Sequence, residues 1–147
     1  MINSKLTVAI HVLSLLALQR GEPLSSDHIA ASVNTNAVVV RRMLGFLRKA
    51  GYVESKEGAG GGWKLAREPE RITLWGVFDA VQSDTALFEL HPREPNPACS
   101  VGRNIQTVLG GIYGQMHKAM KRQLARTTIA AITQSIRKAD LHQRRHG

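Results

Sequence analysis

The residues best suited to bind another molecule are polar side chains gathered around one short amphipathic segment. From Ala37 to Ala50 the apolar residues recur on one face of a helix, and arginine and lysine occupy much of the rest. Such side chains bond phosphate oxygens, and arginine can also bond a guanine edge bidentately in the major groove of DNA. The expected DNA-contact residues are Ser26, Asn36, Val39, Arg41, Arg42, Arg48, Lys49, Lys56, Gly60 and Gly61.

These residues differ in what they can offer to DNA. Asn36 precedes the helix, where it could either cap the helix or bond a base edge. Arg41 and Arg42 could contact guanine or a phosphate, and the alternative is that they form a solvated helix face. Val39 has no side-chain donor.

Cys99 is the single cysteine, so the chain can form neither an intramolecular disulfide nor a zinc site built on several cysteines. It precedes a predicted helix, and the dipole at a helix N-terminus lowers a thiol pKa and favours reversible oxidation. His91 is the nearest histidine in the sequence. We expect a sensor site at Cys99 and His91 that holds no metal or cofactor. An inert cysteine and a small effector bound by the surrounding acidic loop remain alternatives.

The distribution of charge favours an anionic partner. The 147 residues carry a net charge of +9, and a hydrophobic fraction of 43% is typical of a folded domain rather than a disordered chain. Residues 34–67 hold seven basic and two acidic side chains, residues 68–100 hold two and six, and residues 101–147 hold nine and one. No apolar run reaches the ~18 residues of a membrane span, and we recognise no secretory signal, so we expect no membrane partner and a cytoplasmic location.

The elements that would position the basic helix form a helix-turn-helix. The sequence predicts a first helix over Leu6 to Leu18, ended by Gly21. A second, shorter helix begins after Ser25 or Ser26 and ends at a polar turn over residues 34–36, where asparagine tolerates turn conformations. The basic helix follows at once, which completes the helix-turn-helix outline.

Two short alternating segments predict a β-hairpin after the basic helix. Residues 52–56 and 63–66 alternate as strands do, and the glycine-rich run 58–62 lies between them. A phosphate-binding loop is excluded, because strands flank the glycines on both sides and no Gly-Lys-Ser/Thr sequence follows. The glycines suit a tip that needs positive φ and approaches a DNA backbone, and we expect Trp63 to pack beneath it. Such a hairpin is the wing of a winged helix.

The second half of the chain predicts helices suited to dimerisation. Thr73 can cap a helix, an irregular loop follows, and a long helix is expected from Val101 to Leu124. Thr127 or Thr128 can cap a last short helix. The predicted fold is mainly α with a small β-hairpin. It divides into a winged helix-turn-helix domain (1–82), a sensor loop (83–100), dimerisation helices (101–138) and a polar tail (139–147), which we expect to fray from Leu141 to Gly147.

The chain resembles the Rrf-two family of transcriptional regulators, which includes the iron–sulfur cluster regulator and the nitric-oxide-sensitive repressor. The resemblance is carried by Gly51 to Val53, Gly58 to Arg67, Ile72 to Leu74 and Cys99 to Gly102. It implies a winged helix followed by a long helix that crosses its partner in a homodimer. It also implies binding to a palindromic site in double-stranded DNA, often as a repressor.

The sequence departs from that family at its cofactor site and its wing. Iron–sulfur members hold the cluster with three cysteines and a nearby histidine, whereas this chain matches only Cys99 and has Gly102 at the histidine position. Glu57 stands where some members have a basic wing residue, so we expect Lys56 to replace it. The sequence therefore predicts a homodimeric DNA-binding repressor that responds to a redox or small-molecule signal without an iron–sulfur cluster. The alternatives are a thiol enzyme using Cys99 and a winged-helix module that binds protein.

Overall fold

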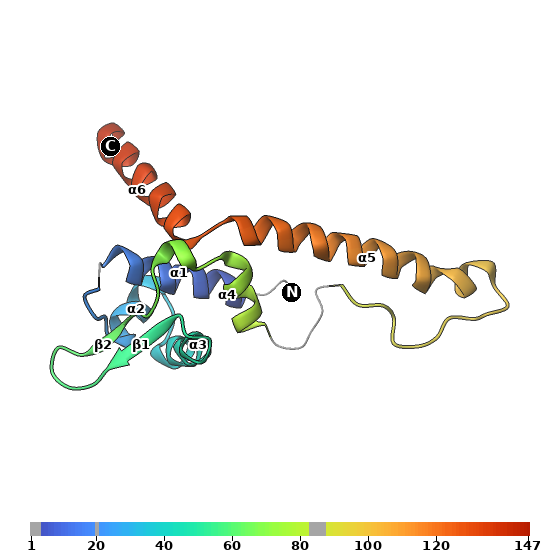
Figure 1. Cartoon of the computed structure of the whole chain (residues 1–147), viewed down its shortest axis with the longest axis horizontal. Coiled ribbons are helices and arrows are strands. Elements are labelled where there is room, and N and C mark those ends of the chain that lie inside the picture. The colour runs from blue at the N-terminus through green and yellow to red at the C-terminus, as the bar shows by residue number, and fades with distance from the viewer. Residues whose placement is uncertain (1–3, 20, 83–87) are drawn as a thin grey trace.

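The computed structural model describes residues 4–19, 21–82 and 88–147, and these are mainly helical with one β-hairpin (Figure 1). The elements in chain order are α1 (Ser4–Leu18), α2 (Ser26–Val33), α3 (Ala37–Lys49), β1 (Val53–Lys56), β2 (Gly62–Leu65), the 3-10 turn η1 (Pro69–Arg71), α4 (Leu74–Val81), α5 (Ser100–Arg126) and α6 (Ile129–His146). The order confirms the predicted mainly α class and the winged helix. Within the described ranges no helix is both long and apolar enough to cross a membrane.

Capping residues define the helix-turn-helix. The Ser25 hydroxyl accepts a hydrogen bond from the His28 amide at 3.1 Å, so Ser25 rather than Ser26 caps α2. Asn34 ends α2 in the left-handed region with φ 63°, and Asn36 then caps α3. The turn between the two helices is thereby fixed by two asparagines.

The hairpin pairs β1 and β2 antiparallel, with Val53 opposite Leu65. Leu24, just before α2, extends this sheet through a bridge to Trp63, in which the Trp63 amide donates to the Leu24 carbonyl at 2.7 Å. A Cβ atom at Gly62 would lie 2.6 Å from that carbonyl oxygen, so glycine is required for this close approach. The wing is therefore attached to the start of the helix-turn-helix and does not hang free.

One hydrophobic core joins α1, α3 and α4 with the segments around them. Its largest fully buried side chains are Leu13, Ile29, Leu44, Leu47, Ile72, Ile129, Val12, Val40, Val53 and Val77. Because α3 contributes only Val40, Met43, Leu44 and Leu47 to the buried set, its other faces remain outside the core.

The two C-terminal helices leave the core in different directions (Figure 1). None of the residues of α5 is buried, and this helix projects far beyond the winged helix. The C-terminal end of α5 lies against the winged helix. There the Leu74 amide donates to the Thr127 carbonyl and the Ile129 amide to the Ile72 carbonyl, both at 2.9 Å. The first turns of α6 then pack on the core through Ile129.

The fraying expected from Leu141 to Gly147 is wrong, because α6 continues to His146. The chain does carry the predicted cap, since the Thr128 hydroxyl accepts from the Ala131 amide at 3.1 Å. An ion pair between Asp140 and Arg144, one helical turn apart at 3.1 Å, supports the distal part of the helix. A polar composition did not prevent helix formation here.

Candidate nucleic-acid interface

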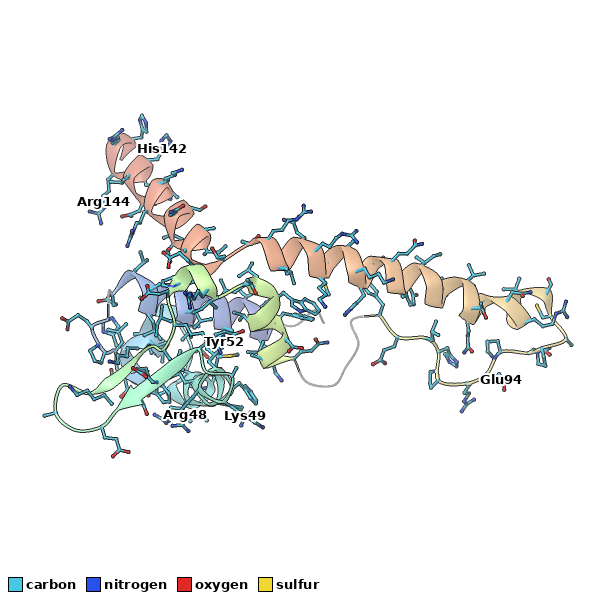
Figure 2. All side chains as sticks on the ribbon, viewed as in Figure 1. Arg48, Lys49, Tyr52, Glu94, His142 and Arg144 are labelled. Carbon is cyan, nitrogen blue, oxygen red and sulfur yellow. The ribbon has the colours of Figure 1, made fainter. Side chains whose placement is uncertain are left out.

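The outer faces of α3 form the first part of the candidate interface. Arg41, Arg42, Arg48 and Lys49 are all exposed, and Arg48 and Lys49 lie on the side of the body away from α5 and α6 (Figure 2). The four core residues of α3 face the opposite way. This is the arrangement that lets a helix enter a major groove while its apolar face stays packed.

Asn36 serves as the N-cap of α3. Its side-chain oxygen accepts a hydrogen bond from the Val39 amide at 3.0 Å. A bidentate contact with adenine needs both the oxygen and the NH₂ group of an asparagine. The cap engages one lone pair of this oxygen, so a bidentate contact with adenine would have to share the oxygen with the Val39 amide.

A cation–π contact joins α3 to the wing. The Arg48 guanidinium lies 5.5 Å from the centroid of the Trp63 ring, and Trp63 is half-buried against the core. This contact supports the expectation that Trp63 packs beneath the wing. It also gives Arg48 a positioning role, which the sequence did not indicate.

The wing tip carries three of the expected contact residues, and they are placed differently. Lys56 is exposed at the end of β1, and Gly60 has φ 73°, as expected for the tip. A Cβ atom at Gly61 would collide with the Lys56 carbonyl oxygen. The close approach at Gly61 is therefore to the hairpin's own backbone.

Two further expected residues stand slightly apart. Ser26 is the first residue of α2 and is half-buried beside the capping Ser25. Val39 is 42% exposed in the first turn of α3, and its neighbour Val38, which the sequence prediction left out, is 59% exposed. The exposure of Val38 is the main feature of this interface that the predicted contact residues did not include.

The expected sensor residues lie far along the molecule, at the start of α5. Cys99 is exposed at the N-cap position and makes no capping hydrogen bond. The backbone N–H groups of Gly102 and then Val101 nevertheless lower the pKa of the Cys99 thiol, because they stabilise the thiolate. His91 is engaged elsewhere, since its Nδ1 accepts from the Arg93 amide at 3.2 Å.

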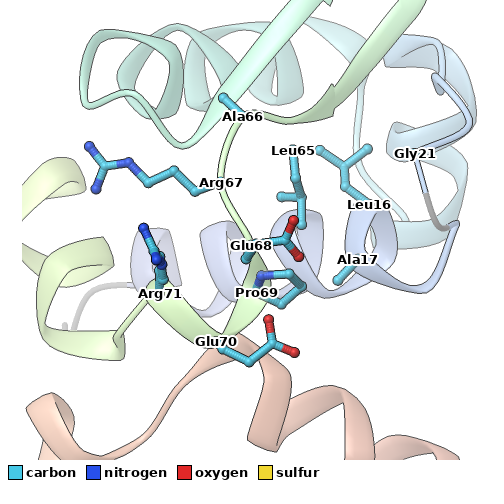
Figure 3. Close-up of a pocket in the computed structure, with 10 residues that line it drawn as sticks. All are labelled: Leu16, Ala17, Gly21, Leu65, Ala66, Arg67, Glu68, Pro69, Glu70 and Arg71. Carbon is cyan, nitrogen blue, oxygen red and sulfur yellow. The ribbon is translucent and has the colours of Figure 1, made fainter.

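A groove apart from α3 is lined by residues such as Leu16, Leu65 and Arg71 (Figure 3). It has a volume of about 890 Å³ and lies between the end of α1 and the segment from β2 to η1. Arg67 in its wall is held by the Tyr52 ring, 4.9 Å from the ring centroid, and by the Ala50 carbonyl at 3.4 Å. This groove does not include any residue of α3.

The sequence is similar to known transcriptional regulators over most of its length. Residues 2–135 match the Rrf2 family, described as an iron-dependent transcriptional regulator. YwnA of Bacillus subtilis (strain 168), named as a candidate HTH-type transcriptional regulator, is 46% identical over 125 residues, covering 85% of this chain and 91% of that protein. Protein rrf2 of Nitratidesulfovibrio vulgaris is 34% identical over 109 residues, covering 74% of this chain and 70% of that protein.

Solved structures of similar proteins share the fold. The crystal structure of a candidate DNA-binding protein has 39% identity and a TM-score of 0.70, covering 88% of this chain and 98% of that chain. The structure of CymR, the global cysteine regulator of B. subtilis, has 26% identity and a TM-score of 0.68, covering 92% of this chain and 97% of that chain. Both agree with the winged helix described above.

The residues of this chain do not fit the iron–sulfur cluster that some members of the resembled family hold. Cys99 supplies one thiolate per chain. The Asn96 carbonyl oxygen occupies the space that a side chain at Gly102 would need. Among the described residues no group of three or more histidine, cysteine, aspartate or glutamate side chains could hold a metal ion. The first turn of α5 therefore has no room for a ligand side chain at position 102.

Proposed function

Because the chain belongs to the Rrf2 family of transcriptional regulators, we propose that it is a homodimeric repressor that binds a palindromic operator. The observation that carries this proposal is the exposed basic face of α3 beside the wing, with Arg48 linking the two through Trp63. Segment 34–67 supplies an excess of basic side chains at this edge, and phosphate contacts account for much of the affinity of such proteins.

The exposed surface of α5 supports a homodimer. Val101, Val108, Ile112 and Met116 are between 41% and 63% exposed along this helix. A second copy that packs on this apolar stripe would remove it from water, which stabilises association. In a symmetric dimer two copies of α3 meet successive major grooves about 34–36 Å apart, and the operator is then palindromic.

A redox or small-molecule signal would act on this dimer without iron. A redox signal would act at Cys99, because the backbone N–H groups at the start of α5 lower the pKa of its thiol and favour the reactive thiolate. Oxidation of Cys99 changes the charge and hydrogen bonding at the N-terminus of α5, the proposed dimerisation helix. A change in how the two copies pack would then alter the affinity for DNA. Protein purified without oxygen should lack cluster absorption bands, and peroxide should change the operator affinity of the native chain while leaving that of Cys99→Ser unchanged.

The alternatives draw less support from the molecule. A thiol enzyme needs a histidine base near its nucleophile, and His91 bonds the Arg93 amide instead. A winged helix that binds only protein would not need the basic excess of segment 34–67. Recognition of duplex DNA therefore remains the function that this surface suits best.

The experiment is a binding titration on two duplexes of equal length. One carries the sequence that the protein enriches from a random duplex library or the promoter of its own gene, and the other carries the same bases scrambled. Tight binding to the first alone supports the proposal. Equal binding to both at physiological salt contradicts it.

A further inference from the structure

The first turn of α3 exposes two apolar side chains at the position where a recognition helix meets base edges. Val38 is 59% exposed and Val39 is 42% exposed, and neither belongs to the hydrophobic core. Valine is also a poorer helix former than alanine, because its branched side chain is restricted at χ1. Nothing in the folding of the described chain accounts for two valines here.

A single line of residues runs along the outermost face of α3. Val38, Arg42, Gly45 and Lys49 follow one another at helical spacing, and all four point away from buried Val40 and Leu44. A Cβ atom at Gly45 would meet no heavy atom within 4 Å, although glycine is a much poorer helix former than alanine in a helix interior. Packing within the described chain therefore does not explain Gly45 either. Its missing side chain leaves the middle of this face flat, so a groove could approach it closely.

Valine can recognise only an apolar group on DNA. It has no donor or acceptor, and a polar base edge covered by it would lose its water without a replacement hydrogen bond. In the major groove the apolar group on a base edge is the 5-methyl group of thymine. The cap at Asn36 fixes the Val39 amide and with it the direction of this turn.

We infer that Val38 and Val39 contact thymine 5-methyl groups, so that the operator carries thymine where the first turn of α3 enters each half-site. This inference rests on the proposed function and names what part of that surface recognises. Arg41 and Arg42 flank the valines and supply the donors for guanine or phosphate.

The experiment removes thymine methyl groups one at a time. The sequence enriched from a random duplex library by the full-length protein is synthesised with each thymine replaced by deoxyuridine, which keeps every hydrogen-bonding group. We expect a three- to fivefold loss of affinity at one or two thymines in each half-site, which corresponds to about 0.8 kcal/mol per buried methyl group. Replacement at the other thymines should change nothing.

Val38→Ala and Val39→Ala then assign the effect to the valines. Each variant should lose affinity for the thymine duplex and lose much less for the deoxyuridine duplex, so the two changes should not be additive. Lys56→Ala is the matched control, because a phosphate contact on the wing should lower affinity for both duplexes by the same factor. Circular dichroism checks that the alanine variants keep the native helix content.

Each other outcome decides a separate point. If the protein enriches a defined sequence but deoxyuridine has no effect, or the effect is additive with both valine variants, the thymine contact is wrong and the repressor proposal stands. If no sequence is enriched and the protein binds all duplexes equally, the proposed function is wrong and this inference is overturned with it.

Discussion

The Arg48 guanidinium lies over the Trp63 ring at 5.5 Å from its centroid, and this contact connects the helix that carries the basic side chains to the wing. Trp63 in turn pairs through its backbone with Leu24, which precedes the helix-turn-helix. These two contacts fix the position of α3 relative to the wing. Preorganised contacts of this kind reduce the ordering that binding to a duplex would otherwise require.

Arg41→Ala and Arg42→Ala are expected to weaken operator binding. Both side chains are exposed on α3, and each loss should be roughly 1–3 kcal/mol if the guanidinium contacts a base edge. Fluorescence anisotropy with operator and with random duplex separates the two kinds of contact. A loss of the same size on random DNA would assign these arginines to phosphates and remove them from sequence recognition.

Gly45→Ala is expected to stabilise the protein and weaken its binding to DNA. The added methyl group has open space in the free protein and gains up to about 1 kcal/mol of helix propensity. The same methyl group projects from the outer face of α3, so it would keep this face further from the major groove. Thermal denaturation and operator titration of the same preparation measure the two effects.

Ser135→Ala is the control for that experiment. Ser135 is exposed on α6, where alanine also favours the helix but lies away from α3. It should raise stability slightly and leave operator affinity as it is. Unchanged affinity in Gly45→Ala would show that the face around Gly45 does not meet DNA.

Ile112→Glu is expected to break the dimer without unfolding the winged helix. Ile112 is 45% exposed on a helix with no buried residue, so a charge there costs the isolated chain little. The same charge would be buried in the apolar stripe of a dimer, which is strongly unfavourable. Light scattering should show a monomer, and operator affinity should fall because one chain reaches one half-site only.

Thr107→Glu provides the matched charge on another side of α5, where Thr107 is exposed outside the apolar stripe. This variant should remain a dimer. If both glutamate variants stayed dimeric, the association would have to use a surface other than the apolar stripe of α5.

The reactivity of Cys99 should reach its maximum at a lower pH than that of an ordinary thiol. The amides of Gly102 and Val101 lower the pKa of the thiol, so the thiolate fraction is larger at each pH below the usual range near 8.5. The rate of alkylation by iodoacetamide, measured against pH, gives the midpoint directly. A short peptide with the same flanking residues but no helix is the reference, and a midpoint at or above that of the peptide would contradict the expected shift.

Local signals in the sequence predicted most of the fold. The caps at Asn36, Thr73 and Thr128 lie where hydroxyl or amide side chains precede apolar periodicity, and the glycine run between alternating segments is the hairpin. These features depend on neighbours within a few residues, so a single sequence contains them. The length of α6 was missed because its distal half has little apolar periodicity and depends on pairs such as Asp140 with Arg144.

Contacts between residues far apart in the chain could not be predicted from the sequence. Arg48 with Trp63 and Arg67 with Tyr52 join elements whose relative placement only the folded chain defines. The same holds for Gly102, whose lack of a side chain matters because the Asn96 carbonyl lies against it. The exposure of Val38 likewise depends on which face of α3 the core selects.

The most direct test of the account is a competition titration of the full-length protein between its enriched operator and a scrambled duplex across a range of salt. We predict that the operator binds at least about 10³-fold more tightly at physiological salt, and that log K for both duplexes falls steeply with log salt. Equal affinity for the two duplexes, or an affinity independent of salt, would contradict sequence recognition by α3 and the wing.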